Sequence, residues 1–276
     1  MTANTTPDPI YVMGYSGHER ERLIQQAGLL GPLSERFLRD AGVAPGIRVL
    51  DVGCGVGDVS FLCSALVGPA GNVVGVDRDP AVITRARQRL QDLGTAGVTF
   101  VEADYRTLPD QPPFDAVIGR AVLMYAADPA AALRSLLPQV RPGGIVAFQE
   151  FDFTHVTAFP TNGVQQQLKD WWSQLGERTG IELHMGYKLF PVYRAAGLPD
   201  PAILAETIIG GGQAFAGYAY LADVFRSVLP LLEQLGVATA AEVDIDTLAD
   251  RLRDATVAGG GVIALQSLVG AVSRKT

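Results

Sequence analysis

Three observations predict an α/β fold built on a doubly wound, mostly parallel sheet. Short β-branched apolar segments alternate with segments of helical periodicity, and turn residues bound each apolar segment. Of the 276 residues, 48% are hydrophobic and only 18% are charged. Such alternation is typical of βαβ units, and the low charge suits parallel strands that are buried on both faces.

The core of this fold is expected over about residues 46–150. Its strands are predicted at 47–52, 73–77, 98–102, 114–119 and 144–150, and the helices between them at 57–67, 80–93 and 129–138. Two of these helices open on Asp79-Pro80 and Asp128-Pro129. Aspartate is a strong N-cap and proline suits the first helical position, so both starts support the helical assignment.

Two regions flank the core. Before it, residues 17–42 carry a helical period that we expect to break near Gly31-Pro32. After it, helices are predicted at 162–178, 186–197, 215–235 and 245–257, and strands at 202–209 and 261–273. A strand, a helical excursion and a final strand predict an antiparallel edge on the sheet and a helical cover over its carboxyl ends. The expected parts are an N-terminal helical segment (1–45), the core (46–150), and a helical cover with the last two strands of the same domain (151–276).

Charge and composition exclude several classes of protein. The net charge of −7, from 22 basic and 29 acidic residues, argues against nucleic acid or an anionic membrane as a partner. The chain opens without a signal-peptide pattern and holds no apolar run of about 18 residues, so we expect a cytoplasmic protein. Cys54 and Cys63 should then remain thiols. The histidines and cysteines lack metal-ligand spacing, and no metal is expected.

A glycine-rich turn follows the first predicted strand. Residues 49–57 read VLDVGCGVG, with Asp51 before the turn and glycines at Gly53 and Gly55. A dinucleotide fingerprint would carry a third glycine at position 58, where this chain has Asp58. A fixed carboxylate beside a tight turn suits the ammonium of an amino acid better than a pyrophosphate. A tight βα turn that binds nothing is the alternative.

Acidic residues also end the next two strands. Asp77 ends the second strand, where a carboxylate can accept both hydroxyls of a ribose. Asp104 follows the third strand and could accept a hydrogen bond from an adenine amino group. The alternatives are a helix-capping or loop role for Asp77 and a surface loop role for Asp104.

Five segments together carry a family resemblance. In order and spacing, VLDVGCGVG, VVGVD, VEADYRTLP, FDAVIGRAVLMY and VRPGGIVAFQE resemble the motifs of class I S-adenosylmethionine-dependent methyltransferases. The match covers about residues 46–150. The leader YVMGYSGHERERLIQQ looks like that of small-molecule members of the ubiquinone/menaquinone-biosynthesis type, in which a leading helix often folds over the cofactor. The resemblance implies a Rossmann-like seven-stranded sheet with an antiparallel last strand, S-adenosylmethionine as cofactor and S-adenosylhomocysteine as product.

The resemblance also implies roles for individual residues by matched position. Asp51, Gly53 and Gly55 would hold the methionine moiety, and Asp77 would bind the ribose. The adenine would be contacted by Arg78, the backbone of Ala103, Asp104 and Tyr105. Arg120 would line the sulfonium side through its carbonyl, and Tyr11 and Tyr15 would close the pocket.

A general base is needed only if the acceptor must lose a proton. The candidates are His155 after the fifth strand, Tyr125 after the fourth and Tyr15 in the leader. His155 could deprotonate a phenol, a carbon acid or an amine, since the unperturbed pKa of histidine is about 6.5. The alternative is a solvated or capping histidine.

The segment after the fifth strand bears on the acceptor. Glu150 and Asp152 alternate with Phe151 and Phe153, so one pair is expected to face the cavity and the other to pack. Both tryptophans and many other aromatic residues follow residue 150. They can line an apolar acceptor pocket or simply form core.

We therefore expect methyl transfer to a small apolar acceptor, aromatic or from secondary metabolism, with O-, N- and C-methylation all open. The expected partner is a small molecule, with neither nucleic acid nor membrane, and a homodimer is a further option. One alternative function is an NAD(P)-dependent oxidoreductase, against which Asp58 argues. The other is a catalytically silent, cofactor-binding regulator.

Overall fold

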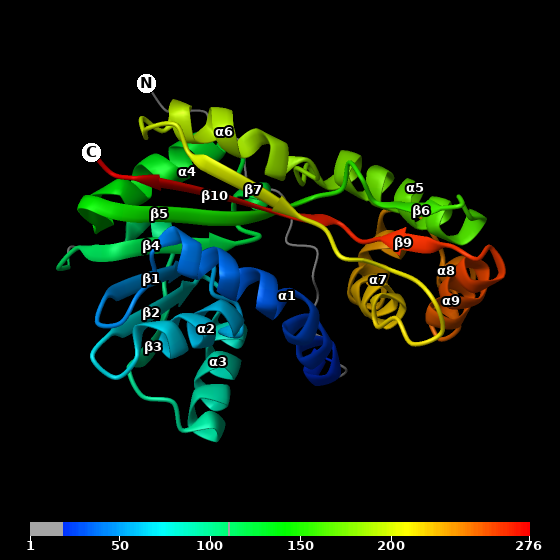
Figure 1. Cartoon of the computed structure of the whole chain (residues 1–276), viewed down its shortest axis with the longest axis horizontal. Coiled ribbons are helices and arrows are strands. Elements are labelled where there is room, and N and C mark those ends of the chain that lie inside the picture. The colour runs from blue at the N-terminus through cyan, green and yellow to red at the C-terminus, as the bar shows by residue number, and fades with distance from the viewer. Residues whose placement is uncertain (1–18, 110) are drawn as a thin grey trace. The chain divides into compact units, whose positions relative to one another are not determined.

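The structure, a computed structural model of the chain, describes residues 19–109 and 111–276 (Figure 1). The helices are α1 (Glu19–Ala41), α2 (Asp58–Val67), α3 (Pro80–Leu93), α4 (Pro129–Leu136), α5 (Gly163–Thr179), α6 (Met185–Ala195), α7 (Gly217–Gln234), α8 (Ala240–Val243) and α9 (Leu248–Ala258). The strands are β1 (Arg48–Val52), β2 (Asn72–Asp77), β3 (Val98–Glu102), β4 (Phe114–Arg120), β5 (Val140–Asp152), β6 (Thr157–Phe159), β7 (Ala202–Glu206), β8 (Ile209–Gly210), β9 (Val262–Ala264) and β10 (Ser267–Arg274). Single 3-10 turns are η1 (Tyr105–Thr107), η2 (Leu123–Tyr125) and η3 (Leu137–Gln139).

The chain forms two compact units. The sheet unit comprises Leu30–Glu150, Met185–Ala205 and Leu268–Thr276. The helical unit comprises Phe151–His184, Glu206–Ser267 and the described residues up to Leu29.

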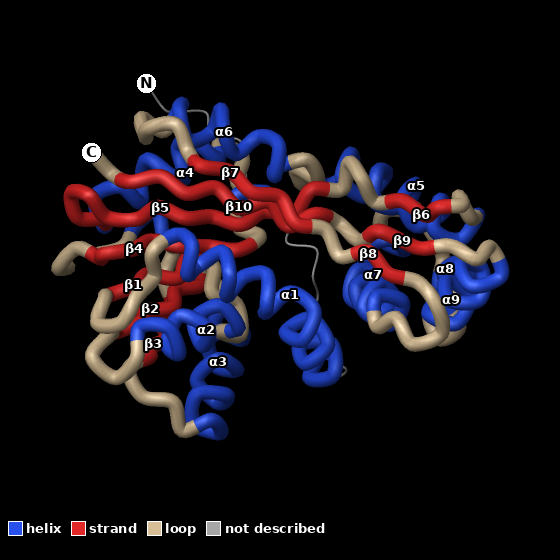
Figure 2. Tube along the Cα trace, viewed as in Figure 1, coloured by secondary structure: helices blue, strands red, loops and turns tan. Residues whose placement is uncertain are grey.

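The sheet unit is built on a seven-stranded sheet with the order β3-β2-β1-β4-β5-β10-β7, drawn in red in Figure 2. The strands β3, β2, β1, β4 and β5 pair in parallel. The last strand runs the other way along β5, since the Gly143 amide donates to the Lys275 carbonyl at 2.8 Å and the Lys275 amide to the Gly144 carbonyl at 2.9 Å. The predicted parallel core with an antiparallel last strand is therefore confirmed. Chain order reverses between β1 and β4, the position at which open α/β sheets bind ligands.

Apolar side chains on both faces of this sheet hold its helices. On one face α1, α2 and α3 share a core with the strands, through residues such as Phe37, Cys63 and Ile83 (Figure 1). On the other face α6 packs through the fully buried Tyr193, whose hydroxyl accepts the Phe148 amide at 3.1 Å and donates to a β10 carbonyl at 2.9 Å. Double-sided burial explains why the strands read as nearly continuous apolar runs.

The break that the sequence predicts near Gly31-Pro32 is wrong. Helix α1 runs without interruption from Glu19 to Ala41, with Pro32 inside it. A proline inside a helix cannot donate a hydrogen bond to the carbonyl four residues earlier, and its ring clashes with that carbonyl. That carbonyl belongs to Gly28, which is exposed, so water can replace the lost donor.

The two strands predicted at 202–209 and 261–273 are each divided between two sheets. Strands β7 and β10 belong to the seven-stranded sheet, whereas β8 and β9 join β6 in a small antiparallel sheet with the order β6-β9-β8. The two segments pass from one sheet to the other next to each other, and there the hydroxyl oxygens of Thr207 and Ser267 lie 2.6 Å apart. The alternation of apolar and polar residues does not indicate which sheet a strand joins. Strand β6 has three residues and is too short to show a clear pattern.

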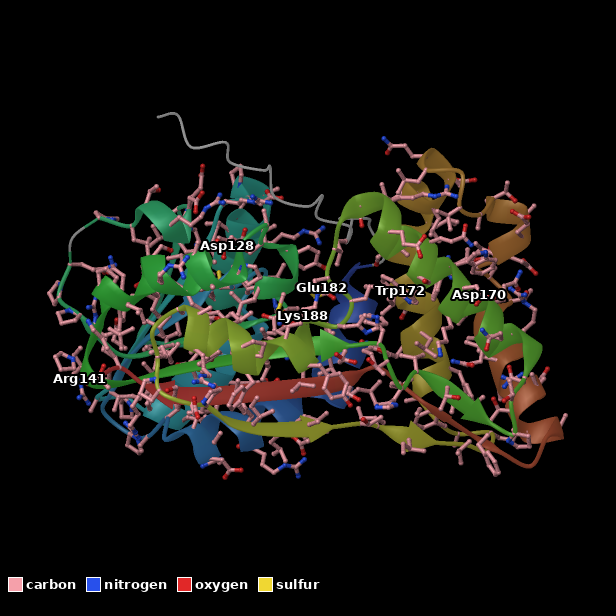
Figure 3. All side chains as sticks on the ribbon, turned by 90° about the horizontal axis from the view of Figure 1, so that it is seen from above. Asp128, Arg141, Asp170, Trp172, Glu182 and Lys188 are labelled. Atoms are coloured by element: carbon pink, nitrogen blue, oxygen red, sulfur yellow. The ribbon has the colours of Figure 1, made fainter. Side chains whose placement is uncertain are left out.

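An aromatic cluster forms part of the core of the helical unit. Trp172 of α5 contacts Phe153 and Phe225, with ring centroids 4.9 and 5.6 Å apart, and Trp171 contacts Phe225 at 5.9 Å. Figure 3 shows Trp172 and the exposed Asp170 on the same helix. Both tryptophans are buried, which favours core over pocket for this part of the aromatic set. In the described residues no helix is both long and apolar enough to cross a membrane.

Candidate functional site

The glycine-rich turn joins the end of β1 to the start of α2. Gly53 and Gly55 have φ angles of +61° and +54°, a region that residues with a Cβ rarely adopt. A Cβ on Gly53 would lie 2.8 Å from Cγ2 of Val122, so this glycine permits a close approach. A Cβ on Gly55 would meet no atom within 4 Å, so the backbone here borders open space. The turn can thus bring main-chain groups directly against a ligand.

Asp77 ties this turn to the end of β2. Its Oδ2 accepts the Gly55 amide at 3.0 Å and its Oδ1 accepts the Asp79 amide at 3.0 Å. The neighbouring Cys54 amide donates to the Val76 carbonyl at 3.0 Å. A carboxylate oxygen can accept two hydrogen bonds, so each oxygen of Asp77 keeps capacity for one hydroxyl.

Asp51 is buried beneath the turn, with only 1% of its surface exposed. The Ser60 hydroxyl donates to its Oδ2 at 2.5 Å. Burial raises the pKa of Asp51 to about 7, although the Ser60 bond and the charge of Arg120 act in the opposite direction. A cationic group bound in the turn would favour the charged form of this carboxyl.

Asp58 opens α2 at the position of the third fingerprint glycine. Its Oδ1 lies 2.9 Å from a guanidinium nitrogen of Arg89, and its Oδ2 lies 3.9 Å from one of Arg120. The Arg120 side chain is 8% exposed, and it also donates to the Ser34 hydroxyl of α1 at 3.1 Å. Both the missing glycine and the extra carboxylate at this helix start disfavour a pyrophosphate.

The residues after β3 are engaged with one another. The Asp104 carboxylate accepts hydrogen bonds from the backbone and guanidinium of Arg106, which lower the pKa of Asp104. The Ala103 amide donates to the Asp77 carbonyl at 2.9 Å and so is used within the sheet. Tyr105 is partly buried at the start of η1, with the Arg106 guanidinium 5.8 Å from its ring centre.

Both acids at the end of β5 are buried, Glu150 at 0% and Asp152 at 1% exposed, while Phe151 and Phe153 are only partly buried. Glu150 accepts hydrogen bonds from three backbone amides of the loop after β4. Burial raises the pKa of Glu150 to about 7, while these three amides lower it. No local motif marks a role for Glu150, because its partners are backbone amides that lie more than 20 residues away in the chain.

The three predicted catalytic residues, and two of the predicted cofactor contacts, are distributed over the chain. Tyr125 ends η2 in the sheet unit and is partly buried, whereas His155 is exposed in the helical unit. Arg78 is exposed directly after β2. Tyr11 and Tyr15 lie outside the described residues. The roles of all five stay predictions.

His184 belongs to a polar group that the sequence did not indicate. Its Nδ1 lies 3.0 Å from the Thr154 hydroxyl and 3.9 Å from Oδ1 of Asp152. The Phe153 amide donates to the Leu183 carbonyl at 3.0 Å, which brings the two segments together. They are 30 residues apart in the chain, so no local motif marks them.

The residues around the glycine turn fit S-adenosylmethionine. The open backbone at Gly55 suits a close ligand, the remaining acceptor capacity of Asp77 suits a ribose diol, and the buried acid of Asp51 suits a nearby ammonium. These three features lie at the carboxyl ends of β1 and β2, and β1 borders the switch point of the sheet.

Comparisons with known proteins point the same way. Residues 44–188, more than half of the chain, match the family model described as a methyltransferase domain. A relative from Pseudomonas putida, the ubiquinone/menaquinone biosynthesis C-methyltransferase UbiE, is 38% identical over 150 residues, which are 53% of this chain and 56% of the relative. The chain thus spans about half the length of the curated relatives that it matches.

Solved structures share the fold. A geranyl diphosphate methyltransferase in complex with S-adenosylmethionine superposes with a TM-score of 0.56 at 17% identity, covering 95% of this chain and 92% of its own. The phosphoethanolamine N-methyltransferase 2 of Haemonchus contortus gives 0.57 at 16% identity, covering 92% of this chain and 56% of its own. At these identities the likeness concerns the fold, and it confirms the Rossmann-like sheet. Together with the family match, it confirms the resemblance seen in the sequence: this chain belongs to the methyltransferase-domain family, of the class I S-adenosylmethionine-dependent type.

Proposed function

We propose that this chain transfers the methyl group of S-adenosylmethionine to a small apolar acceptor, aromatic or from secondary metabolism. The observation that carries the proposal is the turn after β1. There the backbone of Gly55 borders open space, and the Gly55 amide donates to the Asp77 carboxylate. The main-chain groups of the turn suit the methionine half of this cofactor, and the neighbouring Asp77 carboxylate can accept hydrogen bonds from the ribose hydroxyls of the adenosine half.

The proposed cofactor contacts follow from position. The methionine part would lie at Asp51, Gly53 and Gly55, the ribose at Asp77, the adenine at Arg78, Ala103, Asp104 and Tyr105, and the sulfonium side at Arg120, with Tyr11 and Tyr15 contributed by the N-terminal segment. S-adenosylmethionine supplies the electrophilic methyl group when bound, so the chain has mainly to bind, orient and exclude water. The segment 1–45 would close over the cofactor.

Net charge and the names of the relatives guide the choice of acceptor. A net charge of −7 disfavours nucleic acid. The name of the UbiE relatives places them in C-methylation for ubiquinone and menaquinone biosynthesis, which makes quinone-like rings the first acceptors to test. His155, Tyr125 and Tyr15 are the proposed bases for an acceptor that loses a proton.

A binding experiment tests the cofactor. Isothermal titration with S-adenosylhomocysteine should give a one-site isotherm and raise the melting temperature, since a ligand that binds only the folded state stabilises it. NAD is the control and should have no effect. Binding of NAD alone would overturn the proposal in favour of an oxidoreductase.

A transfer experiment tests the reaction. The protein is incubated with methyl-labelled S-adenosylmethionine and a panel of hydroquinones, phenols, indoles and amines, and mass spectrometry locates the added methyl on carbon, oxygen or nitrogen. Tight binding of S-adenosylhomocysteine with no transfer to any member would instead favour a cofactor-binding regulator.

The proposed setting is the cytoplasm, with the chain alone or as a homodimer. Light scattering after size exclusion measures the mass directly, and 29.3 kDa is the value for a single chain.

A further inference from the structure

Glu150 is a buried carboxylate that the proposed transfer does not itself use. It is 0% exposed near the carboxyl end of β5. The sheet register pairs Arg120 of β4 with Gln149 of β5, so Glu150 is the first residue of β5 beyond the end of β4. Its side chain therefore lies where the chain leaves β4.

Three consecutive backbone amides converge on this carboxylate. Val122 and Leu123 donate to Oε1 at 3.0 and 2.8 Å, and Met124 donates to Oε2 at 3.2 Å. The residue before them, Ala121, has a φ of +55°, a left-handed conformation that is costly for a residue with a Cβ. The sharp turn at Ala121 directs the next three amides at one side chain.

The loop held in this way touches the glycine turn. A Cβ on Gly53 would lie 2.8 Å from Cγ2 of Val122, so the two segments are about as close as a glycine allows. Tyr125 follows at the end of the same loop and is partly buried. A shift of the loop would therefore move Val122 against the turn and displace Tyr125 with it.

The geometry points to Glu150 as a positioning residue for methyl transfer, which holds the loop after β4 against the Gly53 turn through the amides of Val122, Leu123 and Met124. This inference rests on the proposed function, in which the turn binds the methyl donor and Tyr125, at the end of the loop, is one of the proposed bases. Without the carboxylate, three buried amides would lose their acceptor, and the loop would move to regain hydrogen bonds. A misplacement of about 1 Å between reacting groups is enough to slow a reaction strongly.

The test compares three variants with the wild type. Glu150→Gln keeps the size of the side chain but replaces one acceptor oxygen by a donor, and Glu150→Asp keeps both oxygens on a shorter chain. Val146→Ala is the matched control, because Val146 is a buried β5 residue that is not among the partners of the loop amides. It should lower the melting temperature without touching the loop.

The first readout is deuterium uptake with S-adenosylhomocysteine bound. In Glu150→Gln the uptake rate of a peptide spanning 119–126 should rise about tenfold, while a peptide spanning 72–79 around Asp77 stays within about twofold of the wild type. Glu150→Asp should be intermediate, and it serves alone if Glu150→Gln does not fold. Val146→Ala should leave 119–126 unchanged. Equal uptake in this peptide for the wild type and both Glu150 variants would overturn the inference.

The second readout is kinetic and uses whichever acceptor the panel yields. Glu150→Gln should lower kcat about tenfold or more, with the KM for S-adenosylmethionine within about threefold, whereas Val146→Ala keeps kcat within about twofold. An unchanged kcat with a lowered melting temperature would make Glu150 a purely structural residue. If the wild type binds S-adenosylhomocysteine but transfers no methyl group, the proposed reaction fails, and loop uptake alone decides whether Glu150 holds the loop.

Discussion

The Asp77 carboxylate has two roles: it accepts a hydrogen bond from the glycine turn, and it is the proposed acceptor for the ribose hydroxyls. Asp77→Ala should weaken S-adenosylhomocysteine binding by about 1–3 kcal/mol, the cost of losing hydrogen bonds to a charged group. Calorimetry measures this directly. Asp79→Ala is the control, since Asp79 caps α3 through the amides of Ala81 and Val82 and should cost about 1 kcal/mol of stability with affinity retained. Equal affinity in wild type and Asp77→Ala would remove Asp77 from the site.

Asp51 makes stability depend on pH with a definite sign. Its pKa is raised by burial to about 7, against an ordinary value near 4, so between these values the folded state binds a proton that the unfolded state lacks. The stabilisation is complete below about pH 4 and is lost as the pH rises through about 7.

Asp51→Asn should therefore gain stability relative to the wild type as the pH is raised. The difference in unfolding free energy between the two proteins should shift by on the order of 2–4 kcal/mol from about pH 5 to about pH 8, in favour of the variant. Urea unfolding of the ligand-free proteins at both pH values measures it. Parallel pH curves would show that Asp51 does not titrate in this range.

At the scale of elements, α1 shows how a helix tolerates an internal proline. The carbonyl that Pro32 leaves without a donor belongs to the exposed Gly28, and apolar residues beyond the proline, such as Phe37 and Leu38, are buried against the sheet. Packing thus outweighs a local signal that on its own predicts a break.

Pro32→Ala should restore the missing hydrogen bond and stabilise the chain by about 1–2 kcal/mol, less than the full interior cost of proline because the unfolded chain also gains freedom. The matched control is Pro129→Ala at the first position of α4, which follows the capping Asp128 labelled in Figure 3 and where proline costs nothing. Chemical denaturation compares the two. If both substitutions raise the free energy of unfolding, or neither does, the missing hydrogen bond at Pro32 is not what destabilises α1.

At the scale of the whole molecule, charge sets what the chain can bind. A net charge of −7 repels phosphate backbones, so a fluorescent tRNA mixture should show no binding at about 0.1 M salt, as followed by anisotropy. S-adenosylhomocysteine titrated into the same sample is the positive control. Tight tRNA binding that weakens steeply with salt would reopen nucleic acid as the acceptor.

Most of the sheet was predictable because its elements are locally determined. The predicted strand at 98–102 and helix at 80–93 match β3 and α3 at both ends. Each is marked by its own residues, as in the Asp79-Pro80 start of α3, where the Asp79 side chain accepts amides of the first turn. The positions of Asp51, Gly53, Gly55 and Asp77 followed from the same signals, since residues at the ends of neighbouring parallel strands gather at one edge of the sheet.

The sequence by itself determined the parallel core, the family and the residues that end its strands, because hydrophobic period, turn glycines and caps act within a few residues. Only the tertiary structure decided which sheet β8 and β9 join, that α1 passes through Pro32, and that Glu150 binds the amides of Val122, Leu123 and Met124. Each of these depends on partners brought together by the fold from distant parts of the chain, or on burial that outweighs local preference. Such interactions are properties of packing, and no pattern of neighbouring residues encodes them.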